Sequence, residues 1–411
     1  MSEHDIAIIG AGPAGISVAL SLRDRGLRPL LIDRADQVGS SWRGRYDRLK
    51  LNTGRPFSHL PNRPYPKGTA MFPTRDNVVD HLDRHARESG IELRLGTEVT
   101  RIDRAGTGWR LETSTGRISA HQVVVAIGNQ HTARIPQWPG ADGFTAELMH
   151  SSVYRNPRPY QGRNVLVVGA GSSGMEIAHD LATGGAAKVW LAVRNPPNIM
   201  LRSLPGGLPG DLLSLPMYHL PVRVADAIGR RARRANLGDL SQFGLPIPEE
   251  GVFSRVKRLE QVPALVDVDV IDAIRNGSIE VVATVESFDR DKVVLVDGSR
   301  LDAHAVVLAT GYRRALEPPV GHLGVLDARG KPVVAGERPA ADGLRFIGYD
   351  VRPSLIGYMA KQSKRMAKRI VRELSAGLDT PTPARHRAPA SDTRRASCAR
   401  PCRRACSAAD S

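Results

Sequence analysis

The sequence predicts an α/β fold in which two Rossmann-like domains share one chain and the second is inserted into the first. Two glycine-rich segments of one type, residues 10–15 and 169–174, support this prediction. Each follows an apolar run typical of a buried strand and precedes a stretch typical of a helix. Two more apolar runs, residues 122–127 and 305–309, are typical of strands inside a parallel sheet. Alternating strands and helices of this kind predict parallel sheets covered by helices.

Both glycine segments match the pattern G-x-G-x-x-G, which binds the pyrophosphate of a dinucleotide. The first glycine permits a tight turn, the second admits the pyrophosphate, and the third lets the helix approach the strand. The phosphates then lie at the positive end of the helix dipole. We expect cofactor contacts from Gly10, Gly12, Pro13, Ala14 and Gly15 in the first segment, and from Gly169, Gly171, Ser172, Ser173 and Gly174 in the second.

The residue after the second strand of each unit distinguishes the two nucleotides. Asp33 ends the first such strand, and a carboxylate there accepts hydrogen bonds from ribose hydroxyls and repels a 2′-phosphate, as suits FAD. Arg194 ends the other, and its guanidinium can bind a 2′-phosphate, which favours NADPH over NADH. A capping role for Asp33 and a solvated-loop role for Arg194 remain open.

The predicted domains are discontinuous. Residues 1–158 and 301–375 form the expected FAD-binding domain, and residues 159–300 the expected NADPH-binding domain. Residues 198–250 contain six prolines and interrupt the alternating pattern, so we interpret them as an insertion. Paired hinge strands are expected near residues 155–163 and 297–303, and helices at residues 76–89, 222–235 and 353–373. Residues 376–411 are predicted to be a disordered basic tail.

The positions of the cysteines exclude one class of enzyme that binds two dinucleotides, the C-x-x-C disulfide reductases. Cys398, Cys402 and Cys406 are the three cysteines of the chain, and all lie in the predicted tail. A C-x-x-C disulfide reductase is therefore excluded, and Pro401 between the cysteines argues against a metal site.

Charge and hydropathy limit the partners. The formal net charge of +16 suits anionic cofactors, but no pattern of aromatic and basic residues indicates nucleic-acid binding. No stretch approaches the ~18 apolar residues of a membrane span, and no signal peptide is evident, so we expect a cytoplasmic enzyme without a transmembrane segment. The sequence leaves the oligomeric state open.

Residues 144–154 resemble the identifying motif of the class B flavin-dependent monooxygenases of the flavin-containing monooxygenase family, F-x-G-x-x-x-H-x-x-x-Y. Phe144, His150 and Tyr154 match the motif, whereas Ala146 replaces its glycine. Residues 46–51, 175–178 and 262–268 resemble the YUCCA-type branch of this family. Two segments, residues 126–128 and 309–312, resemble the A-T-G-type links between its domains.

The resemblance implies further site residues. As cofactor contacts it suggests Arg34, Trp42, Arg43, Leu49, Thr53, Gly128, Thr310, Gly311 and Tyr312, and as catalytic residues Asn52, His150 and Tyr154. Alternatives stay open for three residues: Trp42 as an ordinary core residue, Asn52 as a turn residue, and His150 as a strand-end cap or as a residue that links the domains or positions a cofactor.

The resemblance also implies a reaction. NADPH would reduce FAD, and the flavin would activate O₂ as a C4a-(hydro)peroxide that oxygenates an amine, a sulfide or a 2-oxo acid. Tyr154 stands where Baeyer–Villiger enzymes usually carry tryptophan, which favours heteroatom oxygenation or oxidative decarboxylation. A Baeyer–Villiger monooxygenase, an NADPH oxidase and a flavin-binding regulatory protein remain alternatives.

Overall fold

The structure, a computed structural model, describes residues 2–204, 207–260, 262–352 and 355–378. The chain divides into two units, Met1–Arg372 and Glu373–Ser411, and the sites below lie in the first. Residues 379–411 lie outside the described residues. The expectations for Cys398, Cys402 and Cys406 therefore have no structural counterpart here. Of the basic tail predicted at residues 376–411, residues 376–378 are helical, and the rest lies outside the described residues.

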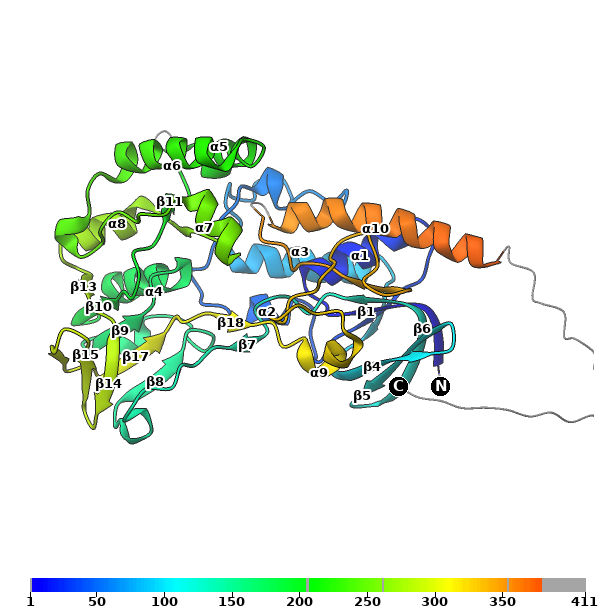
Figure 1. Cartoon of the computed structure of the whole chain (residues 1–411), viewed down its shortest axis with the longest axis horizontal. Coiled ribbons are helices and arrows are strands. Elements are labelled where there is room, and N and C mark those ends of the chain that lie inside the picture. The colour runs from blue at the N-terminus through cyan, green and yellow to red at the C-terminus, as the bar shows by residue number, and fades with distance from the viewer. Residues whose placement is uncertain (1, 205–206, 261, 353–354, 379–411) are drawn as a thin grey trace, which may run out of the picture. The chain divides into compact units, whose positions relative to one another are not determined.

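The first sheet has seven strands in the order β3-β2-β1-β6-β5-β4, and β19 also pairs with β6 (Figure 1). Its strands are β1 (Ser2–Ile9), β2 (Leu30–Ile32), β3 (Glu92–Arg94), β4 (Val99–Ala105), β5 (Gly108–Thr113), β6 (Gly116–Val125) and β19 (Leu344–Phe346). The pairs that involve β1, β2, β3 and β19 are parallel, whereas β4, β5 and β6 form an antiparallel meander.

Several helices accompany this sheet. They are α1 (Pro13–Arg23), α2 (Ser40–Arg43), α3 (Arg75–Glu88), α9 (Glu317–Val320) and α10 (Leu355–Leu378). Pro13 begins α1, where the missing N–H costs nothing. Thr74 and Asn77 form a reciprocal capping box at the start of α3, which confirms the predicted helix.

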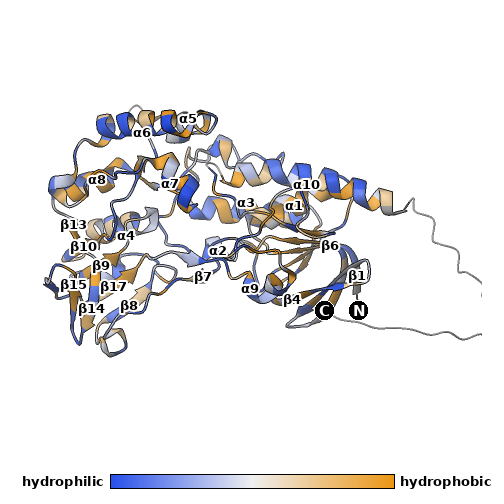
Figure 2. Ribbon diagram, in the orientation of Figure 1, coloured by the Kyte–Doolittle hydropathy of each residue, from blue (hydrophilic) through white to orange (hydrophobic). Residues whose placement is uncertain are grey.

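The second sheet has five parallel strands in the order β13-β10-β9-β17-β8. They are β8 (Glu147–His150), β9 (Asn164–Val168), β10 (Lys188–Ala192), β13 (Glu280–Val282) and β17 (Ala305–Leu308). Figure 2 shows that its central strands are hydrophobic, as expected of parallel strands buried on both faces.

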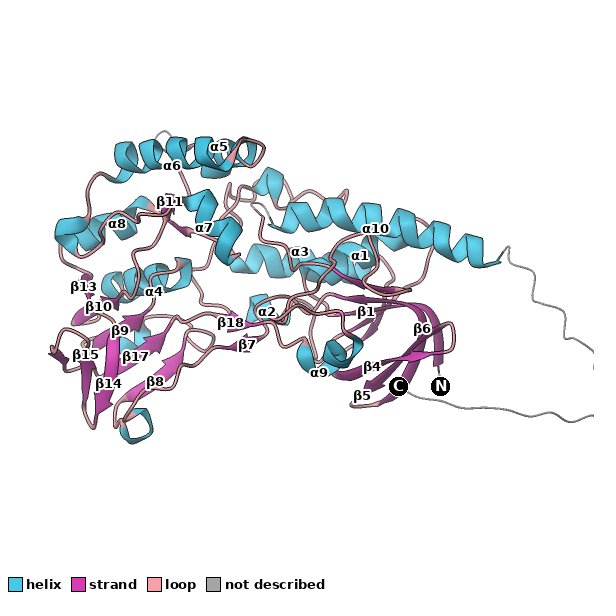
Figure 3. Cartoon of the chain, in the orientation of Figure 1, coloured by secondary structure: helices cyan, strands magenta, loops and turns pink. Residues whose placement is uncertain are grey.

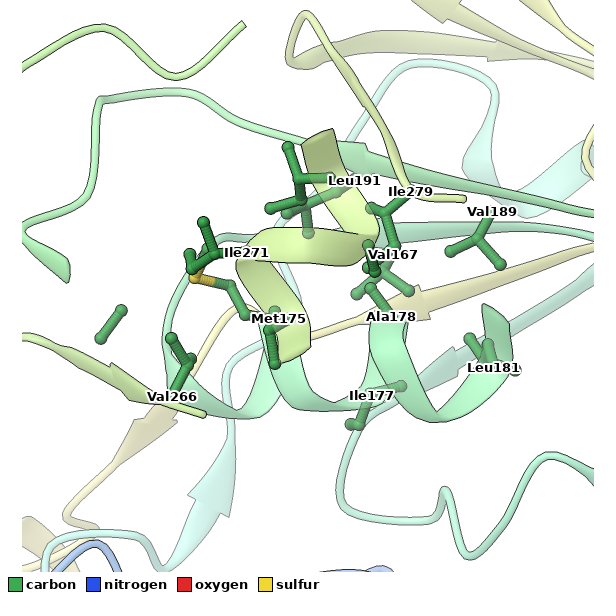
Figure 4. Packing of buried hydrophobic residues seen from close by; sticks show 14 of the residues in the cluster. Val167, Met175, Ile177, Ala178, Leu181, Val189, Leu191, Val266, Ile271 and Ile279 are labelled. Carbon is green, nitrogen blue, oxygen red and sulfur yellow. The ribbon is translucent and has the colours of Figure 1, made fainter. Parts of the chain in front are cut away.

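Helices α4 (Ser172–Thr183) and α8 (Val268–Arg275) pack together over this sheet, and their buried core includes Val167, Met175 and Ile271 (Figure 4). An antiparallel meander contributes apolar side chains to a further core cluster with the same sheet. Its strands are β14 (Val285–Asp289), β15 (Lys292–Leu295) and β16 (Arg300–Leu301).

Two strands and the hinges differ from the prediction. Residues 147–150 and 305–308, which the predicted division assigns to the first domain, form β8 and β17 of the second sheet. The expected paired hinge strands near residues 155–163 and 297–303 are wrong: residues 155–163 contain no strand, and Arg300–Leu301 pair with Lys292–Leu295. The paired segments that follow β6 and β17 are β7 (Thr132–Ala133) and β18 (Tyr312–Arg313). Two-residue strands leave no periodic pattern, because their pairing depends on residues far away in the sequence.

The predicted insertion is longer than residues 198–250 (Figure 3). It contains β11 (Ile199–Leu201), α5 (Gly210–Met217), α6 (Val222–Leu237), α7 (Val252–Leu259) and β12 (Ala264–Val266). β11 pairs in parallel with β12, so this excursion closes near residue 266. Within the described ranges, no helix is long and apolar enough to cross a bilayer.

Candidate active site

The first glycine loop is closed by its own backbone. Gly10 has a φ of +108°, and a Cβ there would lie 2.5 Å from the carbonyl oxygen of Ala126. A Cβ at Gly15 would lie 1.8 Å from the carbonyl oxygen of Gly10. Both positions therefore require glycine, the first for its left-handed backbone and both for their close contacts.

The second glycine loop repeats this geometry. Gly169 has a φ of +111°, and a Cβ there would lie 2.7 Å from the carbonyl oxygen of Ala309. A Cβ at Gly174 would lie 1.8 Å from the carbonyl oxygen of Gly169. The two motifs found in the sequence are therefore the same turn, built once on each sheet.

The middle glycines differ from the others, because a Cβ at Gly12 or Gly171 would meet nothing within 4 Å. They are the N-caps of α1 and α4, and neither cap supplies a side-chain acceptor to the first helical turn. The N–H groups of these turns can therefore bind an anion in the field of the helix dipole. An open approach beside an uncapped helix start fits a pyrophosphate in each loop.

The remaining loop residues have mixed roles. Pro13 fills the first position of α1, and Ala14 is buried. The Ser172 hydroxyl accepts a hydrogen bond of 2.9 Å from the backbone N–H of Leu265, so it supports β12. Ser173, the next residue, begins α4 together with Ser172. Their contacts with cofactors stay predictions.

Asp33 holds the first loop in place. Its Oδ2 accepts from the backbone N–H of Ala11 at 2.6 Å, and its Oδ1 from that of Ala35 at 2.9 Å. A carboxylate can accept more than two hydrogen bonds, so Asp33 can still accept one from a ribose hydroxyl. Arg34, beside it, is exposed. The turn role that the sequence left open is present, and the ribose contact stays a prediction.

Arg194 is exposed and lies two residues after the end of β10. The carboxyl ends of parallel strands are the edge at which dinucleotides bind in folds of this kind. The position therefore suits a guanidinium for a 2′-phosphate, and the assignment stays a prediction.

The residues expected to line the flavin also hold elements together. Trp42 is half-buried on α2. Arg43 donates from Nε to the carbonyl of Val38 at 3.0 Å and lies 3.5 Å from a carboxylate oxygen of Asp83 on α3. Leu49 packs against the core cluster of the second sheet. Arg43 and Leu49 thus have structural partners in addition to any cofactor contact.

A buried ionic network, which the sequence did not predict, includes Asn52. The side chain of Arg202 is 3% exposed and donates to Asp267 at 2.7 Å, to Asn52 at 3.1 Å, and to Glu176. The hydroxyl of Tyr46 donates to the other oxygen of Glu176. Burial lowers the pKa of Arg202 and raises that of Tyr46. The network joins the loop after β2 to α4, to the end of β11 and to the start of α8.

The sequence held only a weak signal for this network. Glu176 and Asp267 fall in segments that resemble the YUCCA-type branch, but nothing singled out their side chains, and Arg202 had no signal at all. A hollow of about 370 Å³ borders the network. Its other lining residues are Arg48, Lys50, His179, Asp269 and Val270. Since Glu176 lies two residues after Gly174, the network also braces the start of α4.

Thr53 lies next to Asn52 in the same loop. Its hydroxyl is 2.5 Å from that of Ser58, and the N–H of Gly54 donates to Asp211 of α5 at 2.7 Å. Gly128 has a φ of +80°, and a Cβ there would meet nothing within 4 Å. Thr53 and Gly128 therefore both lie in loops. Their contacts with a cofactor stay predictions.

His150 links β8 to the turn after β17. It is 5% exposed, its Nδ1 accepts from the N–H of Ser152 at 3.1 Å, and its Nε2 donates to the carbonyl of Gly311 at 3.0 Å. Its ring meets that of Tyr312 edge-on. Burial lowers the pKa of His150, so the imidazole is neutral at neutral pH. These contacts fit the linking role better than acid–base catalysis.

The other residues of this turn join the two paired segments that follow β6 and β17. Thr310 donates from its hydroxyl to the carbonyl of Arg134 at 2.5 Å. The hydroxyl of Tyr312 accepts from Arg45 at 2.5 Å, and the Arg45 guanidinium lies over the same ring. These residues hold the turn, and their contact with a cofactor stays a prediction.

Tyr154 is a core residue. It is 1% exposed, its hydroxyl donates to Asp180 at 2.8 Å, and its ring lies near those of Tyr46 and Tyr160. Burial and the Asp180 carboxylate raise the pKa of Tyr154. Tyr154 therefore packs in the core, and its predicted catalytic role stays a prediction.

Comparisons with known proteins agree with these features. Residues 7–199 match the family model described as pyridine nucleotide-disulphide oxidoreductase. The indole-3-pyruvate monooxygenase YUCCA1 of Oryza sativa subsp. japonica is 35% identical over 310 residues, covering 74% of this chain and 76% of its own. The probable indole-3-pyruvate monooxygenase YUCCA9 of Arabidopsis thaliana is 33% identical over 314 residues, 74% of each chain.

Solved structures share the fold at low sequence identity. The flavin-containing monooxygenase from Stenotrophomonas maltophilia has a TM-score of 0.68 at 20% identity, covering 91% of this chain and 100% of its own. The open structure of cyclohexanone monooxygenase has a TM-score of 0.70 at 17% identity, covering 92% of this chain and 89% of its own. These likenesses concern the fold.

Proposed function

Because the chain belongs to the class B flavin-dependent monooxygenases, in their YUCCA-like branch, we propose that its substrate is a 2-oxo acid with an aromatic side chain. The chain is an enzyme that uses FAD, NADPH and O₂ to oxygenate a small organic molecule. The observation that carries the choice of substrate is the identity to relatives named as indole-3-pyruvate monooxygenases over about three quarters of the chain.

The proposed reaction is an oxidative decarboxylation. The bond between the carboxyl carbon and the carbonyl carbon of the 2-oxo acid breaks, and one atom of O₂ enters the new carboxylate. The other atom leaves as water, and NADPH supplies the two electrons. The 2-oxo acid, O₂, NADPH and one proton thus give the shortened acid, CO₂, water and NADP⁺.

The residues of the chain contribute position and electrostatics. The Gly10 loop with Asp33 would hold FAD, and the Gly169 loop with Arg194 would hold NADPH. When bound, the flavin supplies the redox and oxygen chemistry. The bonds from Arg202 to Asn52 and Glu176 fix the loop after β2 relative to the start of α4. Fixed geometry between two reactants lowers the entropy cost of a transfer between them.

Product analysis under ¹⁸O₂ tests this proposal. The enzyme with NADPH should convert indole-3-pyruvate to indole-3-acetate that carries one ¹⁸O atom, with one CO₂ released per NADPH. Parallel reactions with trimethylamine, methyl phenyl sulfide and cyclohexanone should give little product. Selective oxidation of the amine or sulfide, lactone from the ketone, or H₂O₂ as the main product with every compound would each overturn it.

The cytoplasmic location predicted from the sequence also remains a proposal. Fractionation of cells that express the full chain at native level would test it, with activity expected in the cytosolic fraction.

A further inference from the structure

The excursion between β9 and β17 contains a large apolar hollow of its own. It lies among β11, α5, α6 and α7 and measures about 790 Å³, part of it open to solvent. Its apolar lining includes Ile199, Leu201, Leu204, Met217, Leu237 and Phe253. A mostly apolar lining with a few polar groups is typical of small-molecule sites.

A charged side chain without a partner borders this hollow. Arg233 of α6 lines it, and all three guanidinium nitrogens are buried without a hydrogen-bond partner among the described residues. Burial lowers the pKa of Arg233, yet a guanidinium stays protonated in proteins. A buried charge without a partner is unfavourable, and an anion that pairs with it removes this penalty.

Glu250, Asn236 and Asn198, which also line the hollow, have partners, whereas Arg230, the other cation of the lining, is exposed. Glu250 accepts two hydrogen bonds from Arg258, at 2.9 and 2.6 Å. Asn236 donates to the carbonyl of Ala232 at 2.8 Å, and Asn198 to that of Glu250 at 3.2 Å. The nearest acidic influence on Arg233 is Asp239, which is exposed and bonded to Ser241. Arg233 is therefore the buried cation of the lining that has no counter-charge among the described residues.

We propose that this hollow binds an apolar monocarboxylate, with the carboxylate on the guanidinium of Arg233 and the hydrocarbon against the apolar lining. A guanidinium binds a carboxylate through two parallel hydrogen bonds, which are strong where water is excluded. Because Arg230, the other cation of the lining, is exposed, Arg233 is the buried cation of the site, and a second negative charge on a buried ligand would be unpaired.

The proposed site is separate from the ionic network beside the second glycine loop. Leu201 lines the hollow, whereas Arg202, the next residue, reaches Glu176 in the network. The residues that line the hollow and those that line the space beside the network do not overlap. Binding to the hollow can be measured without NADPH and without turnover. Its failure is therefore distinguishable from failure of the proposed reaction.

Calorimetric titration of the FAD-loaded full chain with decanoate tests the proposal. Decanoate should bind with one site per chain, and 1-decanol, which has the same chain length without the charge, should bind about tenfold more weakly or worse. Arg233→Met should weaken decanoate binding by at least about tenfold, and Arg233→Lys should retain part of it. Arg231→Met, an exposed neighbour on α6 outside the lining, should leave it unchanged.

Three results would overturn the proposal: no binding of decanoate, equal binding of decanol, or equal losses in the two methionine variants. Binding only to vesicles with anionic lipid would instead indicate a membrane surface on α5 and α6, and would also overturn it. Thermal unfolding supplies an independent readout. Without ligand, Arg233→Met should raise Tm by about 2 °C or more, because it removes an unpaired buried charge. A lower Tm would show that Arg233 has a partner within the protein.

Discussion

Asn52 accepts a hydrogen bond of 3.1 Å from Arg202, a residue 150 positions further along the chain. The same guanidinium binds Glu176 and Asp267. One side chain therefore connects the loop after the first nucleotide unit to three elements of the second. Its removal should affect both stability and the placement of this loop.

Arg202→Met should lower the free energy of unfolding by about 3 kcal/mol, because it leaves Glu176 buried and charged without its cation. Urea unfolding of the purified protein measures this change. Arg101→Met is the matched control, since it breaks an exposed pair with Asp103 and should cost less than about 1 kcal/mol. Equal losses in the two variants would contradict the importance of the network.

Gly12→Ala and Gly171→Ala should separate the two cofactors. A Cβ at either position meets no protein atom within 4 Å, so both variants should fold. Gly12→Ala should lose most of its FAD absorbance. Gly171→Ala should keep FAD and raise KM for NADPH, because each methyl group would enter the path of a pyrophosphate. Gly143→Ala, open in the same way but outside both loops, is the control. Retention of full FAD in Gly12→Ala would place the flavin elsewhere.

Arg194→Ala should reduce the preference for NADPH over NADH by about tenfold to a hundredfold, the value of one to two charge-assisted hydrogen bonds. The ratio of kcat/KM for the two nucleotides measures this preference. Lys188→Ala, at the opposite end of β10, should leave the ratio unchanged. An unaltered ratio in Arg194→Ala would remove this arginine from the nucleotide site.

Tyr154→Phe should keep kcat within about twofold of the parent enzyme while lowering the unfolding free energy by about 1–2 kcal/mol. The reason is that the hydroxyl bonds to buried Asp180 and lies in the core. Steady-state turnover and urea unfolding provide the two values. A large fall in kcat with unchanged stability would support the catalytic role predicted from the motif.

His81 should make stability depend on pH. Burial, followed by the charges of His85 and Arg84, lowers its pKa from 6.5 to about 4. Between these values the unfolded chain binds more protons than the folded one, so the unfolding free energy should fall as pH decreases from 6.5 to 4. The contribution of His81 is about 3 kcal/mol in total.

Unfolding at several pH values in this window measures the slope. His81→Phe retains an aromatic ring against Tyr65 and should reduce the slope, while His85 and His150, whose pKa values burial also lowers, keep part of it. His219→Phe, at an exposed position, should keep it. An unchanged slope in His81→Phe would assign the pH dependence to other groups.

The two strand–glycine–helix units and about half of the described α-helices could be predicted because their signals are local. Gly10 and Gly169 need a backbone that other residues rarely adopt, and α3 has a capping box within four residues. The sheet membership of β8 and β17 could not be predicted, since it depends on pairing across long stretches of chain. Nor could Arg202 be found, because its partners lie at positions 52, 176 and 267.

The glycine loops also decide how future variants should be interpreted. In each loop, the third glycine lies against the carbonyl of the first, so any side chain at Gly15 or Gly174 collides within its own turn. Loss of a nucleotide after such a change reports a broken turn and gives no information on ligand contact. Gly12 and Gly171 are free of this coupling, and substitutions there measure recognition separately from folding.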